Sequence, residues 1–431
     1  MLGRIFTLTL LCVICLEFSA QNLVTNQEKY WDYRERALEG FLVVGEGQGQ
    51  SLPSGRKDDR SNYIHWGDAT INLAWYMGVL ATEYYLLDHN ATVRTDAENE
   101  LKKEDTLREI YYTLKAINRL DSVAEPFFDP SHPPEINGFF IRDDVPKEIL
   151  KKNFPGKIYM DSDFTSKKIS DNEESQDQVH HLMMGLMCIY RFVPLDVQYK
   201  GMPIASEAKN VAMRIIDWMR INGWKVVNPA EPNSKGKLTQ VERGPDAYIY
   251  SEGTMRIYDE FVRGDQRKSK LKTNLNPLNK VFWSTLRMGG NPTYARADNM
   301  HMAMAVIATG NGFKKVTYRK LAKKSAKDNW YVYPLLNFAL YPSNKSYRHD
   351  ERVMQGSRDL LDIAPSGGPI APVRGVEETG WSLNNRFLRK RDKVYGKSDY
   401  KHTAEFPGFD YMLLHNLYLI HQKDLQLKRA N

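Results

Sequence analysis

Residues 174–185 have the sequence ESQDQVHHLMMG and give the first indication of the fold. Polar side chains crowd the first half of this stretch, and an apolar run from Leu182 to Val193 follows it. A helix that is apolar on nearly all sides lies in a protein interior. We therefore expect a buried helix here. Its polar amino-terminal turn is either a simple helix start or the rim of a functional site.

The same pattern, an Asp followed by an apolar helix, recurs along the chain. The apolar runs are Ile71–Leu87, Leu182–Val193, Ile249–Phe261, Met302–Ala308, Tyr331–Leu340 and Met412–Ile420. Between them lie amphipathic, more charged segments at Glu104–Leu120, Glu207–Ile221, Leu278–Leu286, Val316–Ala326 and Glu351–Ile363. Buried and half-exposed helices are therefore expected to alternate.

The last apolar run has no long amphipathic segment after it. The segment Gln27–Phe41 can supply that partner, with Tyr30, Tyr33 and Leu38 facing inward, and would then close a ring. We predict an all-α protein in which residues 21–431 form a single (α/α)6 toroid of inner and outer helices. Small β excursions and long loops, at about 88–103, 121–175 and 364–407, interrupt it. An open α-solenoid is the competing architecture.

The amino terminus resembles a secretory signal peptide over residues 1–20. Arg4 supplies a positive charge, Ile5–Cys15 an apolar core, and Ser19-Ala20 a cleavage end. We expect export to the periplasm or secretion. Removal of this segment leaves Cys188 alone, so no internal disulfide is expected. The apolar core is too short for a membrane span, and we expect no integral membrane segment in the mature chain.

Composition narrows the class of partner. The chain has 431 residues, 26% of them charged, and a formal charge of +7 that is not gathered into one basic tract. No helix-turn-helix, RNA-binding or zinc-finger pattern is present, so nucleic acid is not the expected partner. A neutral or anionic poly- or oligosaccharide fits better. No His-Glu-x-x-His motif or Cys cluster occurs, and we expect neither a metal nor a cofactor.

In a helical toroid the inner helices begin at one end, which would gather their Asp residues around one opening. Glycoside hydrolysis uses a pair of carboxyl groups, one as acid and one as base or nucleophile. We take Asp68 and Asp177 as the first candidates, with Trp66 as a stacking platform for a sugar ring. Asp is also a favoured N-cap residue, so the alternative is that each simply begins a helix. Gln178, His180 and His181 are near Asp177 on the same helix and can bind hydroxyls or orient a carboxylate.

A second set of residues suggests another chemistry. A polysaccharide lyase neutralises a uronate carboxylate with Asn, His or Arg and removes a proton with His or Tyr. The residues that suit this are Arg243, Tyr248, Asn299 and His301. Asp298 lies on one helix face with His301, and Trp330 is a further candidate for substrate contact.

Three segments together resemble a helical hairpin of the six-hairpin-glycosidase-like superfamily, in exported bacterial proteins. They are Ser175-Gln176-Asp177-Gln178 before an apolar helix, Asn222-Gly223-Trp224-Lys225-Val226-Val227-Asn228-Pro229 after an amphipathic one, and Val241-Glu242-Arg243-Gly244-Pro245. The detailed likeness covers about residues 170–250. It implies the toroid and a role with carbohydrates, without pointing to one activity.

Three functions remain open on the sequence. A glycoside hydrolase that uses Asp68 and Asp177, with His181 assisting, is the first. A lyase acting on an acidic glycan is the second, and a non-catalytic glycan-binding or scaffold protein is the third. A hydrolase releases reducing sugar without an ultraviolet chromophore, whereas a lyase leaves an unsaturated, absorbing uronide.

Overall fold

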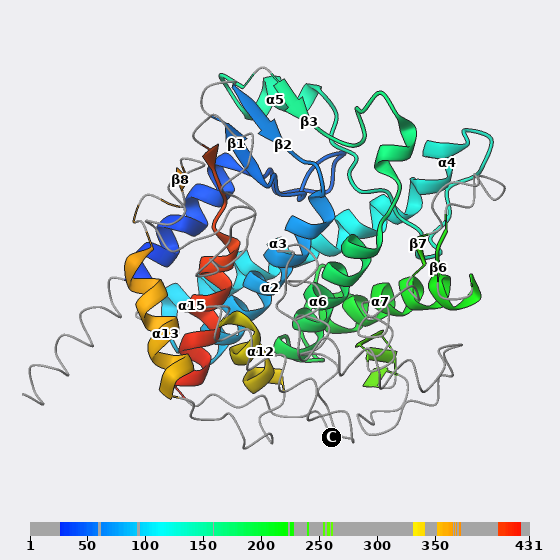
Figure 1. Cartoon of the computed structure of the whole chain (residues 1–431). Helices are drawn as coiled ribbons and strands as arrows, with labels where there is room; N and C mark the ends of the chain where they lie inside the picture. Colours follow the sequence, from blue (N-terminus) through cyan, green and yellow to red (C-terminus); the bar gives the residue numbers. More distant parts are fainter. Residues whose placement is uncertain are drawn as a thin grey trace, which may run out of the picture.

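The computed structural model is mostly helical, as the sequence predicts (Figure 1). It describes residues 26–58, 62–92, 95–157, 159–222, 225–227, 239–240, 253–254, 257–258, 260–261, 331–340, 351–364, 366, 368, 370–371 and 404–423. The predicted signal peptide lies outside these residues. No helix in the described part is long and apolar enough to cross a bilayer.

Two helical hairpins form the first half of the described core. Each pairs an almost fully buried helix with a more exposed one: α2 (Ala69–Asp88) with α3 (Asp96–Ser122), and α6 (Gln176–Phe192) with α7 (Ile204–Ile221). The two buried helices α2 and α6 also pack on each other. Gly185 makes this approach possible, because a Cβ there would come within 2.7 Å of the Ala74 carbonyl oxygen.

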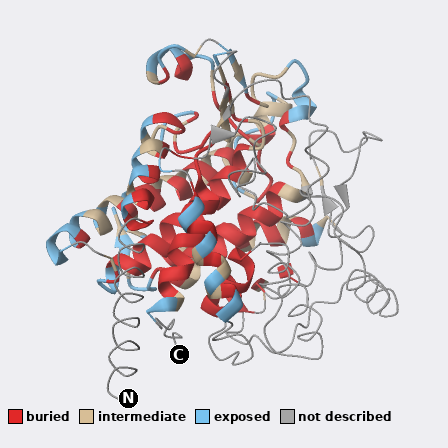
Figure 2. Ribbon diagram, turned by 60° about the vertical axis from the view of Figure 1, so that its left-hand side comes forward, coloured by how far each residue is buried: buried red, intermediate tan, exposed pale blue. Residues whose placement is uncertain are grey.

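The second half of the core comes from the carboxy-terminal part of the chain. Helix α15 (Phe409–Gln422) packs on α2, on α12 (Val332–Leu340) and on α13 (Glu351–Ile363). Helices α12 and α15 are buried along nearly their whole length, whereas α13 buries one side only. The buried helices therefore follow one another in the order α12, α15, α2, α6, and the buried residues of Figure 2 form one continuous interior.

The first and last parts of the chain pack together, as the sequence predicts. The helix over residues 26–40 lies against α15, with the Tyr33 and Tyr411 rings 4.5 Å apart. The Tyr411 hydroxyl donates to the Asn26 carbonyl oxygen at 3.0 Å. Tyr30 and Tyr33 are buried, and Leu38 is partly buried against the core. These contacts confirm the predicted pairing of this helix with α15.

A small sheet covers the side of the molecule on which α2 and α15 begin (Figure 1). Its strand order is β3-β2-β1-β9-β8, with bounds Tyr159–Asp161, Tyr63–His65, Arg56–Asp58, Ala404–Glu405 and Ile370–Ala371. Strand β2 leads into α2 and β9 leads into α15, so the sheet ties both helix starts together. Two further hairpins are shorter still: β4 (Gln198–Tyr199) with β5 (Met202–Pro203), and β6 (Lys225–Val226) with β7 (Thr239–Gln240).

Two of the predicted long loops contain helices. The region 88–103 is not all loop, because α3 begins at Asp96, where Thr95 and Glu98 form a capping box. The region 121–175 contains α4 (Ala124–Phe128), α5 (Glu148–Asn153), a 3₁₀ helix (Ile169–Asn172) and β3. Residues 141 and 142 of this region contact Glu173, just before α6, and bring the Arg142 side chain close to the start of that helix.

Candidate functional site

The candidate site lies where β2 and β3 run into the starts of α2 and the 3₁₀ segment. The parallel pairing of β2 with β3 aligns His65 with Asp161, and Asp68 and Asp163 follow this aligned pair by three and two residues. The Trp66 backbone N–H donates to the Asp161 carbonyl oxygen at 2.6 Å and continues this alignment past the strands. Two carboxylates from distant parts of the sequence are thereby brought together.

Asp68 is held away from its own helix. It precedes α2 with φ 60° and ψ 36°, a left-handed conformation that is uncommon for a residue with a side chain, and it makes no side-chain cap. Its Oδ1 accepts a hydrogen bond from Gln178 Nε2 at 3.2 Å and lies 3.6 Å from Arg142 Nη1. The side chain is 30% exposed. The carboxylate is therefore directed to neighbouring segments and remains accessible to solvent.

Asp163 is the second carboxyl group of the site. Its Oδ2 lies 3.8 Å from Arg142 Nη1 and accepts the Asp68 backbone N–H at 3.4 Å. Burial raises the pKa of Asp163 to about 6; Arg142 opposes this increase, whereas the charges of Asp68 and Asp161 add to it. The side chain is still 16% exposed. Asp68 and Asp163, called the carboxylate pair from here on, thus share one guanidinium.

The buried carboxyl group of Asp143 fixes the segment that carries Asp163. Asp143 accepts the Asp163 backbone N–H at 2.7 Å and the Val145 backbone N–H at 3.0 Å. The Ser162 hydroxyl also donates to Asp143. Burial raises the pKa of Asp143 to about 7. Arg142 is fixed from the other side, since its Nε donates to the Glu173 carbonyl oxygen at 2.6 Å.

The amino-terminal turn of α6 contributes Gln178 to the site. Ser175, and not Asp177, is the N-cap of α6, and the Ser175 backbone N–H donates to Gln178 Oε1 at 2.9 Å. The Gln178 amide is therefore oriented so that its Nε2 points to Asp68. Asp177 is half-buried, accepts the Ser175 hydroxyl and does not cap its own helix through its side chain.

The two histidines of α6 lie in different surroundings. His181 Nδ1 lies 2.7 Å from the Asp177 backbone carbonyl oxygen, which makes Nδ1 the protonated nitrogen. His180 is completely buried. The helical spacing correctly indicates that His181 lies close to Asp177. The His181 ring contacts the Asp177 backbone, because a side chain four residues later on a helix lies beside that carbonyl oxygen.

Trp66 is a core residue in this structure. It is 1% exposed, its indole N–H donates to the Leu52 carbonyl oxygen at 3.0 Å, and its ring meets Phe154 edge-on. Neither face of the ring is open to a sugar. The other residues that the sequence suggested, which are Arg243, Tyr248, Asp298, Asn299, His301 and Trp330, lie outside the described part of the chain.

Sequence reasoning missed Asp163 and Arg142. Both belong to the region 121–175, which was expected to be a covering loop. The stretches Arg142-Asp143-Asp144 and Asp161-Ser162-Asp163 are locally dense in charge, and this was the only available signal. Charge density alone does not separate a functional carboxylate from a solvated surface.

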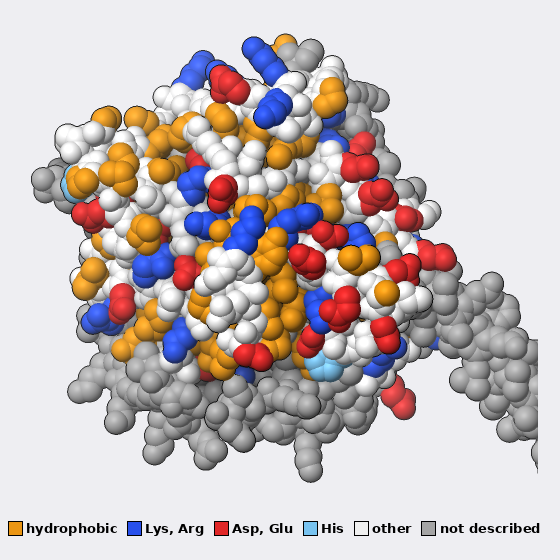
Figure 3. Space-filling model, turned by 180° about the vertical axis from the view of Figure 1, so that it is seen from behind, with side chains coloured by type: hydrophobic (Ala, Val, Ile, Leu, Met, Phe, Trp, Pro, Cys, Tyr) orange, Lys and Arg blue, Asp and Glu red, His pale blue; other side chains and the backbone are white. Residues whose placement is uncertain are grey.

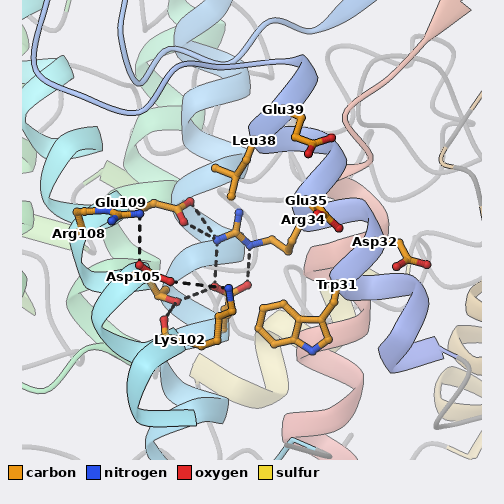
Figure 4. A pocket seen from close by; sticks show the side chains of 12 residues that line it. Trp31, Asp32, Arg34, Glu35, Leu38, Glu39, Lys102, Asp105, Arg108 and Glu109 are labelled. Atoms are coloured by element: carbon orange, nitrogen blue, oxygen red, sulfur yellow. Dashed lines mark hydrogen bonds and ion pairs between the residues drawn. The ribbon is translucent and has the colours of Figure 1, made fainter. Parts of the chain in front are cut away.

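A separate pocket of about 510 Å³, whose lining includes neither Asp68 nor Asp163, lies between the helix over residues 26–40 and α3 (Figure 4). Its floor is a buried ion network. Arg34 donates to Glu83 at 2.7 Å and to both oxygens of Glu109 at 3.0 Å, and the Tyr30 and Tyr76 hydroxyls donate to the same two carboxylates. We interpret this network as the attachment of the first helix to α2 and α3.

Charge is mixed on the described part of one face of the molecule. On the face opposite to that of Figure 1, Lys and Arg side chains lie beside Asp and Glu side chains among the described residues (Figure 3). The described residues on this face therefore form no continuous basic track of the kind that a phosphate backbone contacts. Within the described ranges, no group of three or more His, Cys, Asp or Glu side chains is placed to hold a metal ion.

Comparison with known proteins gives no relative. No protein-family model, no curated protein and no solved structure matches the chain.

Asp410, at the start of α15, gives a prediction about stability. It is fully buried, its Oδ2 has no hydrogen-bond partner, and burial raises its pKa from 3.8 to about 7. The folded state therefore holds this proton more tightly than the unfolded state, and stability is lost as pH rises from about 4 to about 7. Asparagine cannot ionise, so Asp410→Asn is expected to avoid this loss. At pH 8 its free energy of unfolding should exceed that of the wild type by up to about 4 kcal/mol.

Urea unfolding of both proteins at pH 4.5 and pH 8 measures this effect. Asp196→Asn, at an exposed loop position, is the matched control and should leave the pH dependence unchanged. Equal pH dependence in Asp410→Asn and the wild type would show that Asp410 is ionised at little cost in the folded protein.

Proposed function

We propose that the chain is an exported glycoside hydrolase built as a single (α/α)6 toroid. The fold proposal is supported by the succession of buried helices α12, α15, α2 and α6, by their more exposed partners, and by the packing of the first helix against the last. Export is proposed on the signal-like residues 1–20, and amino-terminal sequencing of the secreted protein tests it.

The observation that carries the proposal is the carboxylate pair. One carboxyl group, Asp163, has its pKa raised to about 6, so part of the population is protonated near neutral pH. Asp68 accepts Gln178 and faces Arg142, contacts that complement a carboxylate. Two acids whose environments differ in this way are suited to the two roles of glycoside hydrolysis.

Asp163 is proposed to donate its proton to the oxygen of the departing sugar. Asp68 is proposed to activate a water molecule or to attack the sugar directly. Arg142 lies 3.6 Å from Asp68 Oδ1 and 3.8 Å from Asp163 Oδ2. The two carboxyl groups are consequently no farther apart than the roughly 5–10 Å that hydrolytic pairs span.

The residues on α6 have supporting roles in this proposal. Gln178 orients Asp68, since its amide is itself fixed by the Ser175 backbone. Asp177 is close in sequence to Gln178 and half-buried, and we assign it to binding sugar hydroxyls and not to the acid step. His181 is bonded to the carbonyl oxygen of residue 177 and is proposed to hold that turn.

Product analysis tests the proposed function. The secreted protein is incubated with soluble polysaccharides, both neutral and uronate-containing, and reducing ends and far-ultraviolet absorbance are followed together. We expect reducing ends to increase without a new chromophore. An absorbing unsaturated product would favour the lyase, and no product with any polymer would favour a binding protein.

A further inference from the structure

Two tyrosines lie side by side on the strands that lead to the carboxylate pair. Tyr63 on β2 is in register with Tyr159 on β3, and their rings are stacked with centroids 6.1 Å apart at an angle of 21°. Tyr159 is 57% exposed, and Tyr63 is half-buried. Because β3 is the edge strand of the sheet, the outer side of the Tyr159 ring is open to solvent.

The same sheet face carries polar groups next to the rings. Alternate residues of a strand face the same side, so His65 and Asp161 follow Tyr63 and Tyr159. His65 Nδ1 lies 3.2 Å from Asp161 Oδ2, and Arg56 Nη2 lies 2.9 Å from His65 Nε2. The order along the face is therefore aromatic rings first, then hydrogen-bonding groups, then the carboxylate pair.

The length of this face suits a chain-like ligand. From Tyr159 to Asp163 is four residues, which extend over at most about 13–14 Å. A few sugar rings in a row occupy such a length. Tyrosine presents a flat apolar face with a polar edge, and a sugar ring presents an apolar C–H face between hydroxyls, so the two surfaces match.

We propose that this face of β2 and β3 is a binding surface for a neutral saccharide chain, with the exposed ring of Tyr159, backed by Tyr63, as the stacking platform. The neighbouring acids favour a neutral chain over a uronate. Asp68, Asp161 and Asp163 lie close together and outnumber the two arginines beside them, Arg56 and Arg142, so a carboxylate on each sugar would add like charge. That the bound saccharide runs toward the carboxylate pair rests on the proposed hydrolase function. That a saccharide binds to this face does not depend on it.

Affinity electrophoresis of the mature protein tests the surface. The gels contain hydroxyethyl cellulose, glucomannan, arabinoxylan or dextran as neutral polymers, and polygalacturonate or alginate as charged ones. We expect at least one neutral polymer to retard the wild type. Tyr159→Ala should weaken that binding about tenfold, because the ring face is lost. Tyr159→Phe keeps the ring and should bind within about twofold of the wild type.

Tyr199→Ala removes a half-buried tyrosine on β4, in a different part of the structure, and is the control for nonspecific effects. Unchanged retardation of Tyr159→Ala, retardation by the uronate polymers alone, or retardation by no polymer would each overturn the proposed surface. Asp163→Asn in the same gels separates the two proposals. If Asp163→Asn and wild type both bind a neutral polymer through Tyr159 but wild type releases no sugar, the surface stands and the hydrolase fails.

Discussion

Asp163→Asn is expected to lower kcat on a natural glycan by roughly 100- to 10,000-fold, the usual contribution of a positioned general acid. Asparagine keeps the shape of the side chain but has no carboxyl proton to give to the departing oxygen. The variant should remain folded, because burial of Asp163 already opposes its charged form and the Asp143 contact is made by the backbone. Steady-state rates of sugar release measure the effect.

The choice of substrate sharpens this test. An aryl glycoside with an acidic phenol as the leaving group needs little protonation. The loss of rate in Asp163→Asn should therefore be much smaller on this substrate than on the natural glycan. Asp68→Asn should not recover, because the leaving group does not replace a base or nucleophile. Asp171→Asn changes an exposed carboxylate in the same region and is the matched control. Equal losses for Asp163→Asn on both substrates would contradict the role of general acid.

Arg34→Leu is expected to lower the free energy of unfolding by roughly 3–5 kcal/mol, the range found when one partner of a buried ion pair is removed. Arg34 is the only cation that Glu83 and Glu109 contact through hydrogen bonds in the described structure. Both carboxylates are buried, and Arg34 is a cause of the lowered pKa of Glu83, against the effect of burial. Leucine would leave two buried carboxylates that keep hydroxyl donors but have lost their cation.

Denaturant unfolding of Arg34→Leu and of a surface control measures this cost. Arg220 pairs with Asp217 at 2.9 Å with both side chains 46% exposed, and Arg220→Leu should change stability by less than about 1 kcal/mol. Adding Glu83→Gln to Arg34→Leu should restore part of the loss, since one stranded charge is removed. A loss in Arg34→Leu as small as that in Arg220→Leu would mean that the network does not hold the first helix.

The helical core was predictable because burial leaves a clear trace in sequence. Helices such as α2 and α15 are apolar on nearly all sides, and few other structures tolerate such runs. The pairing of the first helix with α15 followed from the lack of a partner after residue 420. The start of α3 was placed too late, because residues 96–103 are mostly exposed and their charged side chains show no apolar periodicity.

The candidate site was only partly predictable. Asp68 and Gln178 were identified from their positions at helix starts, and the structure joins them by a hydrogen bond. Asp163 was missed because a pairing of β2 with β3, between residues almost 100 positions apart, brings it beside Asp68. Strands of three residues are too short to show the alternation of apolar and polar side chains that predicts a strand. Trp66 was assigned to the surface because the sequence does not show which side of a turn faces the core.

The titration of the Asp163 carboxyl group, followed by carbon-13 NMR in the wild type and in Asp68→Asn, tests the carboxylate pair most directly. The pair predicts a midpoint near pH 6 in the wild type. It predicts a lower midpoint in Asp68→Asn, because the neighbouring negative charge that helps to raise the pKa is gone. A midpoint near pH 4 in both proteins would show that Asp163 is an ordinary ionised carboxylate and that no acid–base pair exists at this site.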